Sequence, residues 1–425
     1  MGEGQPVEWE TSEPAVAGGT RGMARGTTPV RGEDLNGAGV GLAPQATRDG
    51  GWEVTLEDVE AIAVGAGILG TGGGGNPYLG KLQLRRYLEA GRRVRVLSVE
   101  RVPDEALGCG IGGMGAPTVG YEKLPSGTEM TGAVEALARF AGRPLDFVLP
   151  GEIGGANGLV PLIVGALMGL PVVDADPMGR AFPELQMDTF MINGVSPSPF
   201  ALADVHGHAV IFDRITDPRW AERLARATTI AMGGSAGLAM PLVHGKQVKE
   251  FGISGTLSLA RRLGQAVLAA RAAHSSPVAA ILAEVPGVHL LDGKVVDVAR
   301  RTVQGFARGA VRIEGLDAFE GQALEIEFQN EYLVARRDGG SRQGGAGEVL
   351  ACTPDLICIV DTETGEPVAT EVLRYGLRVS VLGLAAPWQL KTPAALKVVG
   401  PRAFGYEVEF RPLPGDLLVR PGAAS

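Results

Sequence analysis

The chain has 425 residues, 45% of them hydrophobic and 20% charged, so at roughly 100 to 200 residues per domain it has enough length for two or three domains with a sizeable core. A formal net charge of −9 and the lack of any apolar run of about 18 residues exclude nucleic acid and a membrane from the expected partners. Three cysteines without a CxxC pair, and a first segment without a signal-peptide pattern, predict a cytoplasmic protein.

Residues 1–50 combine Gly, Pro, Thr, Arg and Glu without an apolar period. Such a segment buries too little surface to offset its ordering entropy, so we expect a disordered leader. From residue 51 we expect folded sequence, with Thr55 and Asp58 resembling a capping box ahead of a helix. The sequence GAGILG at 65–70 matches a dinucleotide fingerprint, but that motif requires a preceding strand, so we disfavour a dinucleotide site.

Strands and helices are predicted to alternate up to about residue 220. Helices are expected at 79–91, 130–142 and 157–170, and strands at 92–102, 144–155, 171–174, 208–212 and 228–232. This alternation is typical of an α/β domain, which we place at 51–220.

A long helix is expected at 254–274, after which apolar residues alternate every two positions between turn signals. We therefore expect a β-rich C-terminal domain at 221–415, with a hairpin loop at 341–348 and a tail at 416–425. Within this domain, FQNEYLVA at 328–335 is expected as one interior strand. Its alternation predicts Phe328 and Tyr332 on one face and Gln329 and Glu331 on the other.

Asp174 and Asp176 follow a predicted buried strand at positions i and i+2, so they share a face at the strand end. Glu184 follows in the same loop. Clustered carboxylates bind a cation or raise one another's pKa, and we expect these three to hold one divalent metal ion such as zinc. In the alternative interpretation, Asp176 and Pro177 only open a turn, and Arg180 neutralises the carboxylate.

Glu152 follows a second predicted apolar strand and has Asn157 close by. Glu152 is expected either to act as a general base in the same pocket or to bond adjacent backbone amides. The four glycines at 72–75 exceed what one helix end requires, so we expect a nest of backbone N–H groups that contacts an anionic or carbonyl ligand. The alternative is a flexible turn at a helix end.

Four further residues leave alternatives open. Ser235 has glycines two positions before and after it, as in a nucleophile elbow, and a strand is predicted before it. Cys109 is expected as a buried structural thiol, with a nucleophile as the alternative. His206 and His208 are expected as surface residues, with a zinc site as the alternative.

Several blocks together resemble the S-methyl thiohydantoin desulfurase-like family, which is often found beside hydantoinases. The resemblance covers residues 52–415 and rests on GTGGGGNPYLG, GAPTVGYEK, GEIGGANG, PVVDADPMGRAFPELQM, SGTLSLARRLG, GKVVDVARR, FQNEYLVA and GPRAFGYE. It implies an N-terminal α/β domain, a β-rich C-terminal domain, and metal-assisted desulfurisation or hydrolysis of a hydantoin-like ring. The segment MINGVSPSPFALADVHGHAV departs from the family's usual pattern, which leaves the substrate open.

The chemistry of such a reaction suggests roles for the candidate residues. The expected catalytic residues are Glu152, Lys123 and Arg180, and the expected metal ligands are Asp174, Asp176 and Glu184. The substrate, a small cyclic amide or thioamide, is expected to contact Gly72, Gly73, Gly74, Gly75, Asn76 and Asn157.

Two other function classes remain open at this stage. One is a metal-independent serine or cysteine hydrolase built on Ser235 or Cys109. The other is a non-catalytic subunit that positions a hydantoinase partner. A homo-oligomer is expected in either case.

Overall fold

The computed structural model describes residues 51–115, 119–303, 306–338 and 347–413. The predicted leader at 1–50, the tail at 416–425 and most of the loop at 341–348 lie outside the described residues. Within the described ranges, no helix has both the length and the apolar character needed to cross a bilayer.

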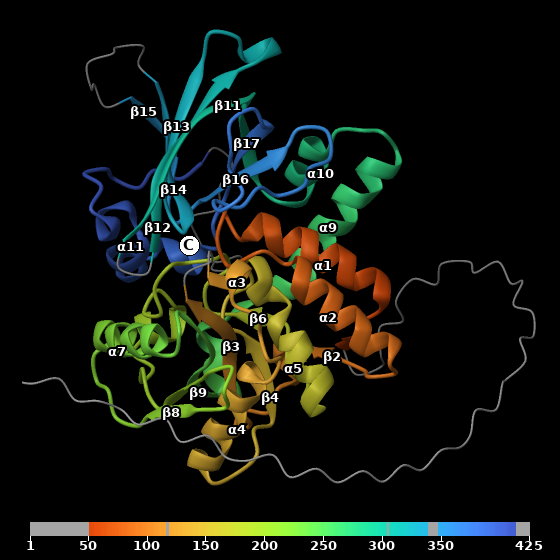
Figure 1. The fold of residues 1–425 in the computed structure, drawn as a ribbon, viewed down its shortest axis with the longest axis vertical. Helices are drawn as coiled ribbons and strands as arrows, with labels where there is room; N and C mark the ends of the chain where they lie inside the picture. Colours follow the sequence, from red (N-terminus) through yellow and green to blue (C-terminus); the bar gives the residue numbers. More distant parts are fainter. Residues whose placement is uncertain (1–50, 116–118, 304–305, 339–346, 414–425) are drawn as a thin grey trace, which may run out of the picture. The chain divides into compact units, whose positions relative to one another are not determined.

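The first half of the described chain forms an eight-stranded mixed sheet (Figure 1). Its central strands β2, β5, β4 and β3 run parallel, and the flanking strands are antiparallel. In spatial order the strands are β1 (Gly51–Glu53), β2 (Arg95–Leu97), β5 (Val172–Val173), β4 (Phe147–Pro150), β3 (Leu107–Gly115), β9 (Ser235–His244), β7 (Phe200–Ala203) and β8 (Ala209–Phe212).

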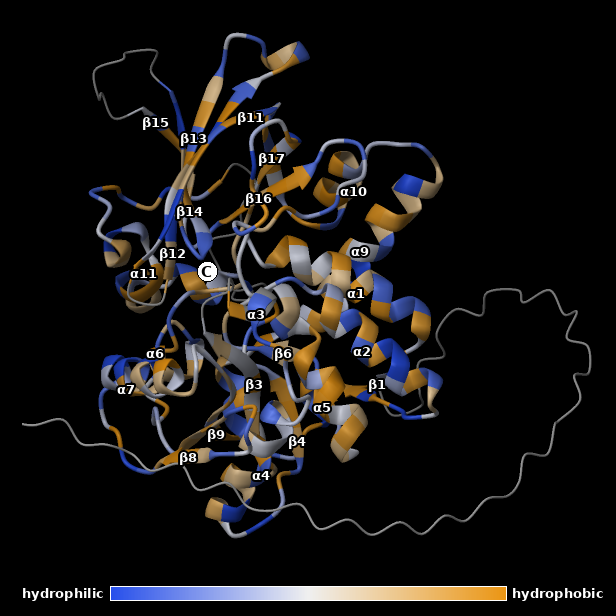
Figure 2. Cartoon of the chain, viewed as in Figure 1, coloured by the Kyte–Doolittle hydropathy of each residue, from blue (hydrophilic) through white to orange (hydrophobic). Residues whose placement is uncertain are grey.

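Helices pack against this sheet, and the apolar strands β3 and β4 are buried along almost their whole length. Burial on both faces is the reason that central parallel strands read as continuous apolar runs. The helix α5 is hydrophobic along most of its length (Figure 2). The helices are α1 (Leu56–Leu69), α2 (Tyr78–Glu89), α3 (Val119–Glu122), α4 (Glu129–Ala141), α5 (Val160–Met168), α6 (Thr189–Ile192), α7 (Pro218–Ala231) and α8 (Gly245–Phe251), with short 3₁₀ turns that include η2 (Gly155–Gly158).

The second half of the described chain forms a seven-stranded antiparallel sheet with its own apolar core. The predicted fold class, an α/β region followed by a β-rich region, is therefore confirmed. In spatial order the strands are β15 (Glu348–Cys352), β14 (Glu331–Arg337), β13 (Ala323–Gln329), β12 (Phe306–Gly315), β11 (Gly287–Val303), β17 (Arg378–Leu384) and β16 (Leu356–Asp361). The helices α9 (Thr256–Ala272), α10 (Pro277–Glu284) and α11 (Pro393–Val399) accompany it.

A short two-stranded sheet of β6 (Ala175–Asp176) and β10 (Ile253–Ser254) places the carboxyl end of β5 beside the start of α9. The strand β9 follows residue 220, where the predicted N-terminal domain ends, but it pairs with β3 and β7 in the eight-stranded sheet. Both pairings connect segments that are far apart in the sequence.

The capping box that the sequence predicts at the start of α1 is confirmed. Thr55 Oγ1 accepts from the Asp58 N–H at 3.2 Å, and the Thr55 N–H donates to Asp58 Oδ2 at 2.9 Å. The sequence GAGILG therefore lies in and just after a helix rather than after a strand, which rejects the dinucleotide interpretation. Gly65 instead serves packing, because a Cβ there would lie 1.8 Å from the Ala260 carbonyl oxygen in α9.

Two local predictions are wrong. The block FQNEYLVA is not one strand: β13 ends at Gln329, β14 begins at Glu331, and Asn330 makes the turn with a φ of 58°. Asn330 stabilises this left-handed turn with its own side chain, since its Oδ1 accepts from the Ala307 N–H at 2.8 Å. Residues 228–232, predicted as a strand, lie at the end of α7 because they continue its amphipathic pattern.

The close approach of α1 and α9 predicts a stability difference between two helical glycines. Gly65→Ala is expected to lower the free energy of unfolding by about 1–3 kcal/mol, because the added methyl group meets backbone atoms of α9. The matched control is Gly132→Ala in α4, where the nearest atom, Ala203 Cβ, is 3.5 Å from the added Cβ. This control is expected to change little or to gain up to about 1 kcal/mol from helix propensity. Denaturant unfolding measures both, and equal effects would contradict the packing argument.

Candidate active site

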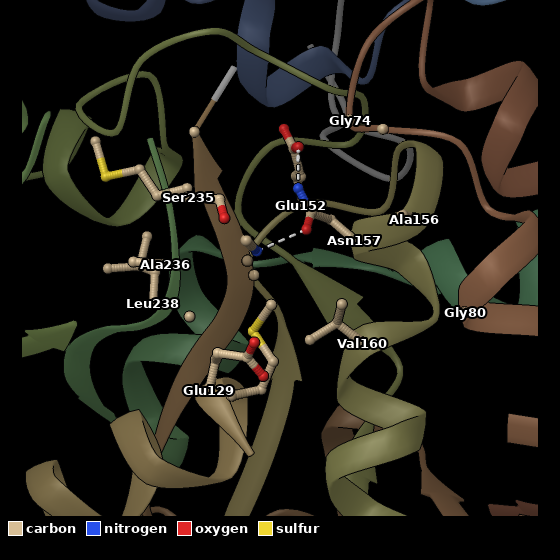
Figure 3. A pocket seen from close by; sticks show the side chains of 18 of the residues that line it. Gly74, Gly80, Glu129, Glu152, Ala156, Asn157, Val160, Ser235, Ala236 and Leu238 are labelled. Carbon is tan, nitrogen blue, oxygen red and sulfur yellow. Dashed lines mark hydrogen bonds between the residues drawn. The ribbon is translucent and has the colours of Figure 1, made fainter. Parts of the chain in front are cut away.

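A cavity of about 580 Å³ lies at the carboxyl ends of β3 and β4. Open α/β sheets commonly bind their ligands at this edge. Its walls come from the end of β3, the start of β9, the turn after β4, the glycine turn after α1, the helices α5 and α7, and the β13–β14 turn. Figure 3 shows Ser235 on the β9 side of this cavity and Glu152 with Asn157 on the other.

Glu152 follows Gly151 just after the end of β4, lines the cavity and is 8% exposed. Its Oε1 accepts from Asn157 Nδ2 at 2.7 Å, and its Oε2 accepts from the Phe182 N–H at 2.9 Å. Burial raises the pKa of Glu152 to about 7, although both hydrogen bonds act to lower it. Both protonation states are thus populated near neutral pH, which is the property a general acid or base requires.

Asn157, in η2, fixes the orientation of Glu152. Its Oδ1 accepts from the Gly113 N–H of β3 at 2.8 Å while its amide donates to Glu152 (Figure 3). Because the Gly113 N–H requires an oxygen acceptor, Asn157 turns its Oδ1 towards Gly113 and its Nδ2 towards the Glu152 carboxyl. Asn157 lines the cavity and is a direct hydrogen-bond partner of Glu152, while its contact with a substrate stays a prediction.

The glycine turn divides into two parts. Gly74, Gly75 and Asn76 line the cavity, whereas Gly72 and Gly73 do not. The first two glycines pack on sheet residues, because a Cβ on Gly72 would lie 2.5 Å from the Tyr332 ring and one on Gly73 would lie 1.9 Å from Glu331 Oε1. The turn therefore serves close packing as well as lining the cavity.

Lys123 also lines the cavity. Its Nζ donates to the carbonyl oxygens of Met232 at 2.7 Å and Ser235 at 3.1 Å. An ammonium group has three N–H donors, so these two bonds hold the charge at the cavity wall and leave capacity for a ligand. Its catalytic role stays a prediction, with which this position is compatible.

The position of Arg180 does not fit the catalytic role that the sequence analysis predicts for it. It is fully buried, does not line the cavity, and donates five hydrogen bonds to uncharged oxygens. These acceptors are the carbonyls of Ala181, Pro354, Asp355 and Tyr332 and the Thr71 hydroxyl. The alternative in which Arg180 pairs with Asp176 is also not seen, and Arg180 instead connects the turns to the antiparallel sheet.

The predicted metal ligands do not come together. Asp176 Oδ2 accepts from the N–H groups of Ile153, Met178 and Gly179 at 3.0, 3.1 and 2.8 Å. Asp174 accepts from the backbone and hydroxyl of Ser258 at the start of α9. Neither lines the cavity, and Glu184, which does, contacts Gln186.

These three carboxylates therefore do not fit a single divalent ion, and among the described residues no group of three or more metal-binding side chains is found. The physical reason is that hydrogen-bond donors of the protein, rather than a cation, contact both aspartates, although Asp176 Oδ1 has no partner among the described residues. A divalent ion held by other groups stays a prediction, which elemental analysis of the purified protein tests.

The other candidate nucleophiles and ligands also have defined positions. Ser235 lines the cavity, but it follows helix α7 and begins strand β9, so the strand–turn–helix order of a nucleophile elbow is absent there. Cys109 is buried in β3, and burial raises the pKa of its thiol, as expected of a structural cysteine. His206 and His208 are exposed, and His208 Nδ1 lies 2.9 Å from Asp204 Oδ2.

Asn330 and Glu331 are among the cavity residues that sequence reasoning missed. Both were assigned to the interior of a strand, and Glu331 was given no role. A charged residue at a position predicted to be interior was the available signal, because a buried carboxyl needs a reason to be there.

Two family models match the chain. The N-terminal domain of the S-Me-THD-like proteins matches residues 57–214, and their C-terminal domain matches residues 216–413. A crystal structure of a protein from Chromobacterium violaceum is similar, with a TM-score of 0.69 and 26% sequence identity over 85% of this chain and 99% of that chain. None of the curated proteins matches.

The buried carboxyl of Asp176 predicts a dependence of stability on pH. Burial raises the pKa of Asp176 from 3.8 to about 7, so between these values the folded protein keeps a proton that the unfolded chain releases. Raising the pH through this window therefore favours unfolding. Asp176→Asn, which keeps an oxygen acceptor without the charge, is expected to reduce this loss of stability.

Denaturant midpoints at about pH 5 and about pH 8 measure the effect, with the exposed Asp213→Asn as the control. The difference in the free energy of unfolding, Asp176→Asn minus wild type, is expected to be more positive at about pH 8 than at about pH 5. A variant that loses more stability at the higher pH would show that the carboxylate must be charged, as in a metal site.

Proposed function

The chain belongs to the S-Me-THD-like family, and from this premise we propose that it is an enzyme that hydrolyses a small thiohydantoin- or hydantoin-like ring in the cavity beside Glu152. The observation that carries the proposal is a buried carboxyl, oriented by Asn157 and with a pKa of about 7, on the wall of a cavity large enough for a small ligand. This combination supports proton transfer at neutral pH.

In the proposed reaction, ionised Glu152 accepts a proton from a water molecule whose oxygen adds to the ring carbon that bears sulfur. The carbon–nitrogen double bond of an S-alkylated ring opens towards nitrogen, which takes up one proton. The carbon–sulfur bond then breaks, a thiol leaves with the second proton, and a carbonyl group forms. Water thus supplies the new oxygen and both protons.

Two further parts of the cavity support this chemistry. The Lys123 ammonium, held by the carbonyls of Met232 and Ser235, places a positive charge where it favours negative charge on the substrate. The backbone at Gly74 and Gly75 lies open to the cavity because neither residue carries a side chain. No step is assigned to a metal ion, because the predicted ligands Asp174, Asp176 and Glu184 do not fit one.

The cavity also suggests the kind of ring substituent. One face of α5 lines it with apolar side chains at helical spacing, namely Val160, Ile163, Val164 and Leu167. A cavity of about 580 Å³ exceeds what a single small ring occupies. We therefore propose an apolar substituent on the ring carbon remote from sulfur, packed against α5.

The role of Glu152 is tested by Glu152→Gln. This isosteric change keeps an oxygen acceptor and removes the base, so kcat is expected to fall by roughly 10²–10⁴-fold. The measurement uses a panel of hydantoins, thiohydantoins and S-methylated thiohydantoins and records ring opening or release of sulfide or thiol. The control is the exposed Glu135→Gln in α4, which is expected to keep wild-type activity.

Equal activity of the two variants would refute the assignment of Glu152. A wild-type protein that converts no member of the panel would refute the proposed reaction and favour a non-catalytic subunit of a hydantoinase.

The substituent is tested by Ile163→Asn together with a series of rings. For wild type, KM is expected to fall from the unsubstituted to the benzyl-substituted ring, since each buried methylene contributes about 0.8 kcal/mol. Ile163→Asn is expected to raise KM roughly tenfold for the benzyl ring and little for the unsubstituted ring, which serves as the internal control. A KM that does not depend on the substituent would contradict the placement against α5.

A further inference from the structure

Glu331 is another carboxyl on the wall of the cavity, supplied by the antiparallel sheet. It begins β14 directly after the Asn330 turn, lines the cavity and is 2% exposed. Its Oε2 has no hydrogen-bond partner in the part of the chain that the structure describes. An unpaired buried carboxyl oxygen is unfavourable, so its presence at a cavity requires an explanation.

The position of Glu331 is tightly constrained by the glycine turn. A Cβ on Gly73 would lie 1.9 Å from Glu331 Oε1, so this side chain rests directly on backbone. Gly74 in turn packs on the turn that follows Glu152, because a Cβ on Gly74 would lie 2.3 Å from the Gly154 carbonyl oxygen. Glu331 and Glu152 therefore contact the same cavity from either side of one glycine turn.

The charges around Glu331 favour its neutral form. Burial raises the pKa of Glu331 well above its usual range, and the negative charge of Glu152 raises it further. The opposing contributions come from Arg180 and the backbone at Gly74 and Glu331. Arg180 does not form an ion pair with Glu331, since its five hydrogen bonds go to carbonyl and hydroxyl oxygens. These surroundings therefore favour the neutral form of Glu331 while Glu152 is ionised.

We propose that Glu331 is the proton donor to the leaving group, acting on the substrate opposite Glu152. This inference rests on the proposed function. Glu152 removes a proton from the attacking water and passes it to the ring nitrogen. As the carbon–sulfur bond breaks, Glu152 takes up the hydroxyl proton of the adduct and the Glu331 O–H gives its proton to the sulfur. The thiol leaves neutral, Glu331 is left ionised and Glu152 protonated, and proton exchange with solvent restores both before the next turnover.

The decisive experiment varies the leaving group on one ring. A methylthio group leaves as a poorly stabilised thiolate and needs the proton, whereas a nitrophenylthio group leaves readily without one. Glu331→Gln is therefore expected to lower kcat on the methylthio ring by roughly 100-fold or more and on the nitrophenylthio ring by less than about tenfold. Glu152→Gln is expected to slow both rings, because both need the activated water.

The matched control is Glu371→Gln. Glu371 is another carboxyl whose pKa burial raises and whose two oxygens have no hydrogen-bond partner among the described residues, but it does not line the cavity. This variant is expected to keep wild-type rates on both rings. Glu331→Asp, which keeps a proton donor, is expected to be more active than Glu331→Gln on the methylthio ring.

An infrared measurement tests the proton on Glu331 without turnover. Near neutral pH the protein is expected to show protonated-carboxyl absorption with one component that Glu331→Gln removes and Glu371→Gln leaves in place. The proposal is overturned if wild type hydrolyses the rings but Glu331→Gln slows both equally. It is also overturned if the wild-type spectrum has no band component that Glu331→Gln removes. If wild type hydrolyses neither ring, the proposed function itself fails, and the infrared band alone then shows whether Glu331 is protonated.

Discussion

The buried guanidinium of Arg180 links the turns at the carboxyl ends of the parallel strands to the antiparallel sheet. It donates to the Thr71 hydroxyl beside the glycine turn, to the Tyr332 carbonyl in β14, and to the carbonyls of Pro354 and Asp355 before β16. Loss of the partners of a buried cation costs about 3–5 kcal/mol, so these acceptors must stay where they are. The walls of the cavity consequently meet in one defined arrangement.

The glycine turn at 72–75 lies between the antiparallel sheet and the turn after β4. Both neighbours are so close to its backbone that there is little room for side chains. Gly72 faces the Tyr332 ring, Gly73 faces the Glu331 carboxyl, and Gly74 faces the Gly154 carbonyl. Gly72 and Gly74 also adopt φ values of 88° and 71°, which favour glycine. The run of glycines is thus explained by packing and conformation together, and the same features leave the backbone at Gly74 exposed to the cavity.

Two of the carboxyls that line the cavity, Glu152 and Glu331, have different surroundings. Glu152 has two hydrogen-bond donors, whereas Glu331 Oε2 has none among the described residues. Burial raises the pKa of both, and the raised value is about 7 for Glu152. These unequal surroundings favour the neutral form of Glu331 while Glu152 is ionised, which is the arrangement that the proposed reaction uses.

Local patterns in the sequence determined the fold class, the capping box at Thr55 and Asp58, and the place of Glu152 after a buried strand. These follow from periodicity and from short-range hydrogen bonds, which depend on neighbours in the chain. Tertiary structure alone decided the partners of the buried polar groups. Asp176 bonds the Ile153 N–H, Asp174 bonds Ser258, and Arg180 bonds the antiparallel sheet. Spacing within one loop cannot reveal such partners, because they come from segments up to 175 residues away.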